Sequence, residues 1–240
     1  IEQAWREYWT ENGFIEIHSP KLMASPSESN AELFKLEYFE GHAYLAQSPQ
    51  FYKQMAMMAG FGRIFEIGPV FRADPSFTSR HATEFTSVDI EVSWIDSHED
   101  IMAIQEQLLV RALTAVSEQH GADIKRLFDI DVVVPTVPFP RITLADAVDI
   151  VKARGHEIQR GGDMDPEGER QIAAHVAETF GHEFVFLTDY PATVRPFYHM
   201  RHADDQTLTK SYDLIWRGTE ITTGAQREHR VDVLIEQIKQ

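Results

Sequence analysis

The apolar residues of this 240-residue chain alternate between helical and strand-like spacing. Residues 1–11 predict a helix, because apolar side chains recur along one helical stripe. The members of that stripe are Ile1, Ala4, Trp5, Tyr8 and Trp9. Asn12 and Gly13 predict the end of this helix, and the segment FIEIHSP at 14–20 then predicts a short strand that ends at Pro20.

A turn and a second helix are predicted at residues 44–60. Ser48 is the expected N-cap and Pro49 the expected first helical residue, because proline is tolerated where no backbone N–H is needed. Met55 to Met58 are expected on the apolar side of this helix.

Two apolar strands joined by a polar loop are predicted within residues 65–94. Residues 97–120 predict a long amphipathic helix, since Ser97 is followed three positions later by an acid, as in a capping box. Residues 141 to about 182 are again helical in pattern, broken by the turn-forming run RGGDMDPEGE, and we expect a helical insertion or lobe there.

Further strands are predicted by the segments EFVFLTDYP, SYDLIWRG and TEITTG. Many neighbouring strands around a few helices predict an α+β fold, with a mostly antiparallel sheet flanked by helices. We expect the 240 residues to form one large domain, or one domain with an insertion.

Composition narrows the class of protein. No run of about 18 apolar residues occurs, which excludes a membrane span. The chain has no cysteine, which rules out disulfides and thiolate chemistry and, with no secretory leader, predicts a cytoplasmic protein. A net charge of -16 argues against a general nucleic-acid-binding protein, because such proteins usually need a basic face.

The loop between the two strands of 65–94 contains groups that suit a nucleotide. Arg72 ends the first strand, where its planar fork of donors could bind a phosphate or carboxylate through two hydrogen bonds. His81 could stack on a base or donate to a phosphate, and Phe85 could form one wall for a flat ring. The alternative is an ordinary hairpin in which Arg72 forms a surface ion pair with Asp74.

A second constellation combines a helix with a strand. Gln50 and Lys53 lie three residues apart in LAQSPQFYKQ, so on a helix they share one face and could bind a small polar ligand. Asp89 and Glu91 share one face of the strand FTSVDIEV. Asp89 could bind an ammonium group and Glu91 could support it. The alternatives are a solvated surface lysine at Lys53 and an Asp89 carboxylate that pairs with a neighbouring arginine.

Several motifs occur in one order along the whole chain: WTENGFIEIHSPKL, LAQSPQFYKQ, GPVFRADPSFTSRHATEF and YDLIWRGTEITTGAQREHR. With these motifs the chain resembles the catalytic domain of class II aminoacyl-tRNA synthetases, specifically the aspartyl-tRNA synthetases of archaeal and eukaryotic type. The resemblance implies that the first helix and strand, up to Pro20, form a homodimer interface. It also implies that the FRAD hairpin binds ATP.

The resemblance assigns roles to individual residues. Residues expected to bind ATP are Arg72, Asp74, Arg80, His81 and Glu220, of which Arg72, His81 and Glu220 are expected to be catalytic. Residues expected to bind magnesium on the ATP phosphates are Asp213, Glu220 and Thr223. Residues expected to bind aspartate are Glu28, Gln50, Lys53, Asp89 and Arg227.

Within the aspartate set, Glu28 lies in the expected lid loop, and Asp89 is expected to bind the α-amino group. Arg227, after Gly224 and Ala225, is expected to clamp the side-chain carboxylate beside Lys53, although it could also be one of several solvated charges in REHR. Related asparaginyl enzymes generally lack the lysine, because a neutral amide would leave a buried cation unpaired. For Asp213 and Glu220 the alternative is cross-strand pairing with Lys210 or Arg217.

The chain departs from the family pattern in three places. Ser29 and Asn30 follow Glu28 where relatives often have two glycines, and Thr223 with Ala225 stand where relatives tend to have Ser and Gly. The third family motif, a Gly-rich strand and helix with an ATP-binding arginine, does not occur, and neither does the N-terminal anticodon-binding barrel. We therefore expect a fragment with little activity of its own.

The activity implied for the complete enzyme is two-step. L-aspartate and ATP form aspartyl-adenylate, and tRNA(Asp) then accepts the aspartyl group, with charging of tRNA(Asn) left open. Two other functions remain open: ammonia-dependent asparagine synthesis on the same core, and a non-catalytic paralogue that binds a partner.

Overall fold

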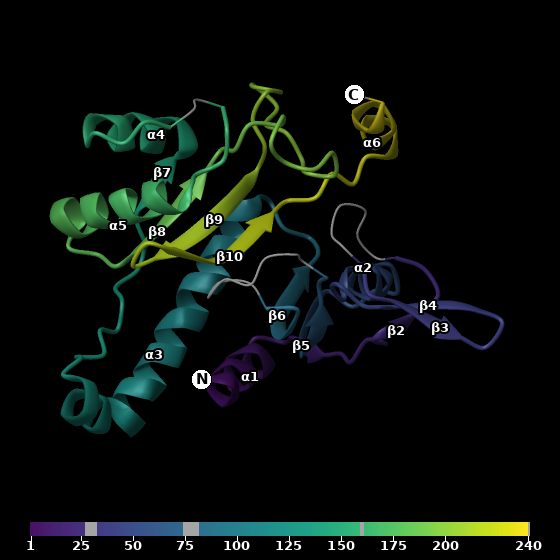
Figure 1. Cartoon of the computed structure of the whole chain (residues 1–240), viewed down its shortest axis with the longest axis horizontal. Coiled ribbons are helices and arrows are strands. Elements are labelled where there is room, and N and C mark those ends of the chain that lie inside the picture. The colour runs from purple at the N-terminus through teal and green to yellow at the C-terminus, as the bar shows by residue number, and fades with distance from the viewer. Residues whose placement is uncertain (27–32, 74–81, 159–160, 240) are drawn as a thin grey trace. The chain divides into compact units, whose positions relative to one another are not determined.

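The computed structural model describes residues 1–26, 33–73, 82–158 and 161–239 (Figure 1). The chain forms two compact units: an N-terminal unit, Trp5–Trp94, and a C-terminal unit, Ile95–Gln240 together with Ile1–Ala4. None of the helices in the described ranges is long and apolar enough to cross a membrane.

The N-terminal unit contains two three-stranded sheets, with orders β1-β5-β6 and β2-β4-β3. The elements of this part of the chain are α1 (Glu2–Glu11), β1 (Ile15–Glu16), β2 (Leu22–Met23), β3 (Lys35–Tyr38), β4 (Gly41–Leu45), α2 (Gln50–Met58), β5 (Arg63–Phe71) and β6 (Glu84–Val92). Strand β5 pairs in parallel with β1 and antiparallel with β6. Its core includes Trp9, whose ring stacks on Phe65 with centroids 4.5 Å apart.

The C-terminal unit is a four-stranded sheet of order β10-β9-β8-β7 with helices on both faces (Figure 1). Its elements are α3 (His98–Phe128), β7 (Arg141–Thr143), α4 (Leu144–Ala153), α5 (Pro166–Phe180), β8 (Phe184–Thr188), β9 (Ser211–Trp216), β10 (Thr219–Ala225) and α6 (Val231–Ile238). Side chains alternate along β8, so Val185 and Leu187 join the cluster with α4 and α5, while Phe184 and Phe186 pack with Met102 of α3.

The expected α+β fold with a mostly antiparallel sheet is confirmed, since the two pairings of β1 with β5 and β7 with β8 are the parallel ones in the described sheets. The capping box is also confirmed: Ser97 accepts from the backbone N–H of Glu99 at 3.0 Å, and the Asp100 side chain accepts from that of Ser97 at 3.2 Å. The helix continues beyond the expected residue 120 to Phe128.

Three expectations need correction. Helix α2 begins at Gln50 with Pro49 at the cap position, one residue later than predicted, although the Ser48 hydroxyl still accepts from the backbone N–H of Gln50 at 3.3 Å. The presumed apolar side of α2 is exposed at Met55 and Met58. Residues 141–143 form strand β7 and are not helical, because they pair in parallel with β8 inside the sheet.

Candidate functional site

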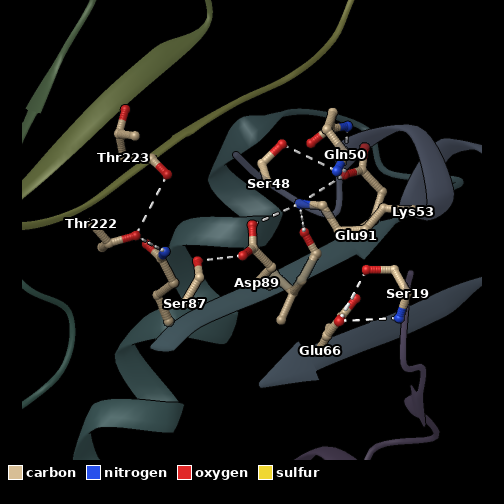
Figure 2. Close-up of polar contacts among 12 residues, drawn as sticks. Ser19, Ser48, Gln50, Lys53, Glu66, Ser87, Asp89, Glu91, Thr222 and Thr223 are labelled. Atoms are coloured by element: carbon tan, nitrogen blue, oxygen red, sulfur yellow. Dashed lines mark hydrogen bonds and ion pairs between the residues drawn. The ribbon is translucent and has the colours of Figure 1, made fainter. Parts of the chain in front are cut away.

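The predicted constellation of α2 and β6 is present in the N-terminal unit and is centred on Lys53 (Figure 2). The Lys53 ammonium lies 3.1 Å from Asp89 Oδ1 and 3.4 Å from Glu91 Oε2, and it donates to the Ile90 carbonyl at 3.3 Å. Lys53 is only 5% exposed, so the alternative of a solvated surface lysine is wrong. A cation this deeply buried needs such partners, because its desolvation is costly.

Local geometry explains why these side chains converge. Gln50 and Lys53 lie one turn apart on α2, while Asp89 and Glu91 alternate with Ile90 along β6 and so share one face. Gln50 Nε2 donates to Glu91 Oε2 at 3.3 Å, which links the helix to the strand a second time. The structure thus brings together three of the residues predicted to bind the amino acid.

Asp89 is bound at both carboxylate oxygens. Oδ1 pairs with Lys53, and Oδ2 accepts a hydrogen bond from Ser87 Oγ at 2.5 Å (Figure 2). Ser87 was not among the predicted site residues, although the period of two that placed Asp89 on this face also places Ser87 there.

A buried acid, Glu66, lies opposite the partly buried Asp89 in the register of β5 and β6. Lys21 donates to Glu66 Oε1 at 2.6 Å, and the backbone and hydroxyl of Ser19 donate to the same oxygen at 3.1 and 3.0 Å. Like charges on paired strands are unfavourable unless each is neutralised, and here each acid has its own lysine. Sequence reasoning missed Glu66 because it lies within an apolar strand and its partners are 45 or more residues away.

In the C-terminal unit, Asp213 on β9 and Thr223 on β10 are register partners, and Glu220 lies at the start of β10. Asp213 pairs with Arg195, and Arg217 pairs with Glu183, so the alternative pairing of Asp213 with Arg217 is wrong. Arg195 lies in PATVRPFY, which carries no pattern that would have indicated it. On β10, Thr222 Oγ1 accepts from Gln105 Nε2 of α3 at 3.1 Å.

The donor set of this unit suits a hard divalent cation. Asp213 Oδ1 is buried without a hydrogen-bond partner. Desolvation, followed by the negative charges of Asp213 and Glu169, raises the pKa of the Glu220 carboxyl to about 7. Two carboxylates whose charge is incompletely balanced, with the Thr223 hydroxyl, fit magnesium when phosphate oxygens supply further ligands. No group of three or more acidic, histidine or cysteine side chains within the described ranges is arranged to bind a metal alone.

Arg227 lies after β10 in the same unit. Its guanidinium carbon is 4.6 Å from the centre of the Tyr198 ring, and its backbone forms an isolated bridge with His199. His199 stacks on Tyr198 with ring centroids 5.0 Å apart, and burial lowers the His199 pKa to about 4. Arg227 is therefore oriented by an aromatic face, unlike a freely solvated charge.

The predicted nucleotide loop is only partly described. Arg72 follows β5, where its guanidinium carbon lies 5.5 Å from the centre of the Phe85 ring and its backbone N–H donates to Thr83 at 2.9 Å. The other predicted residues, Glu28, Asp74, Arg80 and His81, lie outside the described residues.

Comparison with known proteins agrees with the residue pattern. Residues 1–240 match the family model of class II tRNA synthetases (D, K and N), and the chain belongs to this family. It is 44% identical over 240 residues to the aspartate–tRNA(Asp) ligase of Pyrococcus abyssi, covering all of this chain and 55% of that protein. It is also 44% identical to the aspartate–tRNA(Asp/Asn) ligase of Aeropyrum pernix, covering 54% of it.

Solved structures show the same fold. Aspartyl-tRNA synthetase from Entamoeba histolytica superposes with a TM-score of 0.84 at 34% identity, over 99% of this chain and 45% of that one. Asparaginyl-tRNA synthetase from Pyrococcus horikoshii complexed with asparaginyl-adenylate gives 0.87 at 32% identity, over 99% and 54%. The chain spans about half the length of the curated relatives it matches.

Proposed function

We propose that the chain is the catalytic part of an aspartate–tRNA ligase. Such an enzyme activates L-aspartate with ATP and transfers the aspartyl group to tRNA(Asp). The observation that carries this proposal is the buried Lys53, bound by Asp89 and Glu91. A buried ammonium on the substrate face favours an acidic amino acid, because a neutral side chain would not replace a carboxylate as its partner.

In the first step, the aspartate α-carboxylate attacks the α-phosphorus of ATP and pyrophosphate leaves. Asp89 would bind the substrate ammonium, Gln50 and Lys53 would orient the amino acid, and Arg227 would bind its side-chain carboxylate. Arg72 would stabilise the charge that develops on the α-phosphate. Glu28, Asp74, Arg80 and His81 keep the roles predicted for them.

Magnesium, when bound, would neutralise charge on the ATP phosphates. Asp213, Glu220 and Thr223 would bind it, and they would orient the nucleotide through it. In the second step, a ribose hydroxyl of the tRNA attacks the activated carbonyl and AMP leaves, so no covalent enzyme intermediate is required.

A homodimer in the cytoplasm is part of the proposal. Ile15 and Leu22, on either side of Pro20, are 47% and 46% exposed, which supports an interface at this segment. Light scattering coupled to gel filtration of the intact gene product tests it, since a monomer at micromolar concentration would contradict the dimer.

The decisive experiment is aspartate-dependent exchange of pyrophosphate into ATP, with asparagine as the control amino acid. We expect exchange with aspartate alone in the intact gene product, and little in the isolated 240 residues. Added ammonia should not yield asparagine, which distinguishes the ligase from an asparagine synthetase. No exchange from the intact product would favour a non-catalytic paralogue.

The tRNA range is a separate question. Relatives of equal identity are named as ligases for tRNA(Asp) and for tRNA(Asp/Asn). Charging assays with each tRNA and labelled aspartate separate the two specificities.

A further inference from the structure

The Lys53 ammonium already has a complete set of oxygen neighbours. A lysine carries three N–H donors. Three oxygens lie within 3.4 Å of Nζ: Asp89 Oδ1, the Ile90 carbonyl and Glu91 Oε2. A substrate carboxylate can therefore reach Lys53 only by taking the place of one of these three oxygens.

Asp89 is the acceptor that the substrate ammonium would engage. Because Asp89 is proposed to bind the substrate ammonium, its pairing with Lys53 weakens when the substrate binds. Ser87 remains on Asp89 Oδ2 and fixes that carboxylate. The incoming amino acid brings one positive and one negative group to a place where Lys53 and Asp89 previously neutralised each other.

Glu91 is placed to remain unchanged during this exchange. Its Oε2 lies 3.4 Å from Lys53 Nζ and accepts from Gln50 Nε2 at 3.3 Å, so one oxygen connects both α2 side chains to β6 (Figure 2). The Glu91 side chain is 17% exposed. Once Asp89 has turned to the ligand, Glu91 and the Ile90 carbonyl are the remaining anchors of Lys53 among its three oxygen neighbours.

We infer that Glu91 is a positioning residue for amino-acid selection, an inference that rests on the proposed function. It fixes Lys53 and Gln50 against α2 and β6, so that Lys53 cannot swing away from a ligand that lacks a carboxylate. A fixed Lys53 ammonium would face the side-chain NH2 group of asparagine. Both groups are hydrogen-bond donors, so asparagine would bind poorly.

Two variants separate position from charge. Glu91→Gln keeps an oxygen at the same reach, and both neighbours are donors that favour it, but removes the charge. Glu91→Asp keeps the charge but withdraws the oxygen by one methylene. Glu37→Gln, on the exposed strand β3, is a control of the same chemical change.

The experiment is pyrophosphate exchange kinetics in the intact gene product. For Glu91→Asp we expect the aspartate KM to rise about tenfold, as for loss of a charge-assisted hydrogen bond, and the preference for aspartate over asparagine to fall by a similar factor. The ATP KM should stay within about twofold, and kcat should fall less than KM rises. For Glu91→Gln the aspartate KM should rise less than for Glu91→Asp, because the amide oxygen still accepts from Gln50 and Lys53.

The reverse order, with Glu91→Gln impaired and Glu91→Asp normal, would overturn the positioning role in favour of a charge effect. Equal losses for aspartate and ATP would also overturn it, because they would indicate a general structural role. If the wild-type protein showed no aspartate-dependent exchange, the proposed function itself would fail. Normal wild-type exchange with two unaffected Glu91 variants would remove only the role of Glu91.

Discussion

The guanidinium of Arg195 donates to Asp213 Oδ2 at 2.6 Å, and the two side chains are only 13% and 5% exposed. Arg195 also lies over the Tyr190 ring, with its guanidinium carbon 3.7 Å from the ring centre. One carboxylate oxygen of Asp213 is thereby fixed by the protein, and Oδ1 is left without a hydrogen-bond partner. This arrangement fixes the orientation of Asp213 and makes it dependent on Arg195.

Removal of Arg195 should therefore destabilise the protein strongly. Arg195→Met leaves a buried carboxylate without its partner, a change that typically costs about 3–5 kcal/mol. Urea unfolding of the intact gene product, followed by tryptophan fluorescence, measures the loss. The control is Arg126→Met, whose exposed pair with Asp123 should contribute less than about 1 kcal/mol. Equal stabilities of the two variants would contradict the interpretation.

Glu228 should make stability dependent on pH. Its carboxylate accepts from the side chain and backbone of Arg230 and from the backbone of His229. The Arg230 side chain is the largest cause that lowers the Glu228 pKa from 4.5 to about 2. Because the folded protein binds this proton more weakly than the unfolded chain, the stabilisation is complete above about pH 4.5 and is lost as the pH falls toward 2.

Glu228→Gln should accordingly be less stable than wild type near pH 7, by about 1 kcal/mol because solvent screens the half-exposed Arg230 partner. The difference should shrink between pH 4.5 and pH 3 in parallel urea titrations. A difference that stays constant over this range would show that Glu228 acts through shape alone.

A methyl group at Gly224 should be poorly tolerated. A Cβ there would clash with the hydroxyl and ring of Tyr212, which is fully buried. Gly224→Ala should cost about 1–3 kcal/mol, as for other overpacked cores. Gly121→Ala in α3 is the matched control, since its Cβ would lie 3.7 Å from Ser117 Oγ, and it should stabilise by up to about 1 kcal/mol. Thermal unfolding midpoints that move in the same direction for both variants would refute this.

Arg72 should be essential for adenylate formation under the proposed function. Arg72→Lys keeps the charge but loses the planar fork of donors, so pyrophosphate exchange should fall about 100-fold or more. Arg63→Lys, at the start of strand β5 with its guanidinium carbon 5.8 Å from the Phe14 ring centre, is the control and should stay near wild type. An unchanged rate in Arg72→Lys would remove this residue from the mechanism.

Most helices and strands could be predicted because their signals are local. Ser97 and Asp100, within four residues of each other, predict the start of α3, and the period-two alternation of side chains predicts β6. The same periods placed Gln50 and Lys53 on one helical face and Asp89 with Glu91 on one strand face. The short strand β7 was missed, since three residues hardly show a period and their pairing with β8 lies more than 40 residues away.

The sequence by itself determined the family, many of the helices and strands and the candidate site residues, because each of these depends on residue type and short-range spacing. Tertiary structure decided which charges pair. Arg195 meets Asp213 across 18 residues, Lys21 meets Glu66 across 45, and Lys53 is buried only because α2 packs on β6. Such contacts depend on the packing of whole elements, and no local pattern along the chain encodes the distances between them.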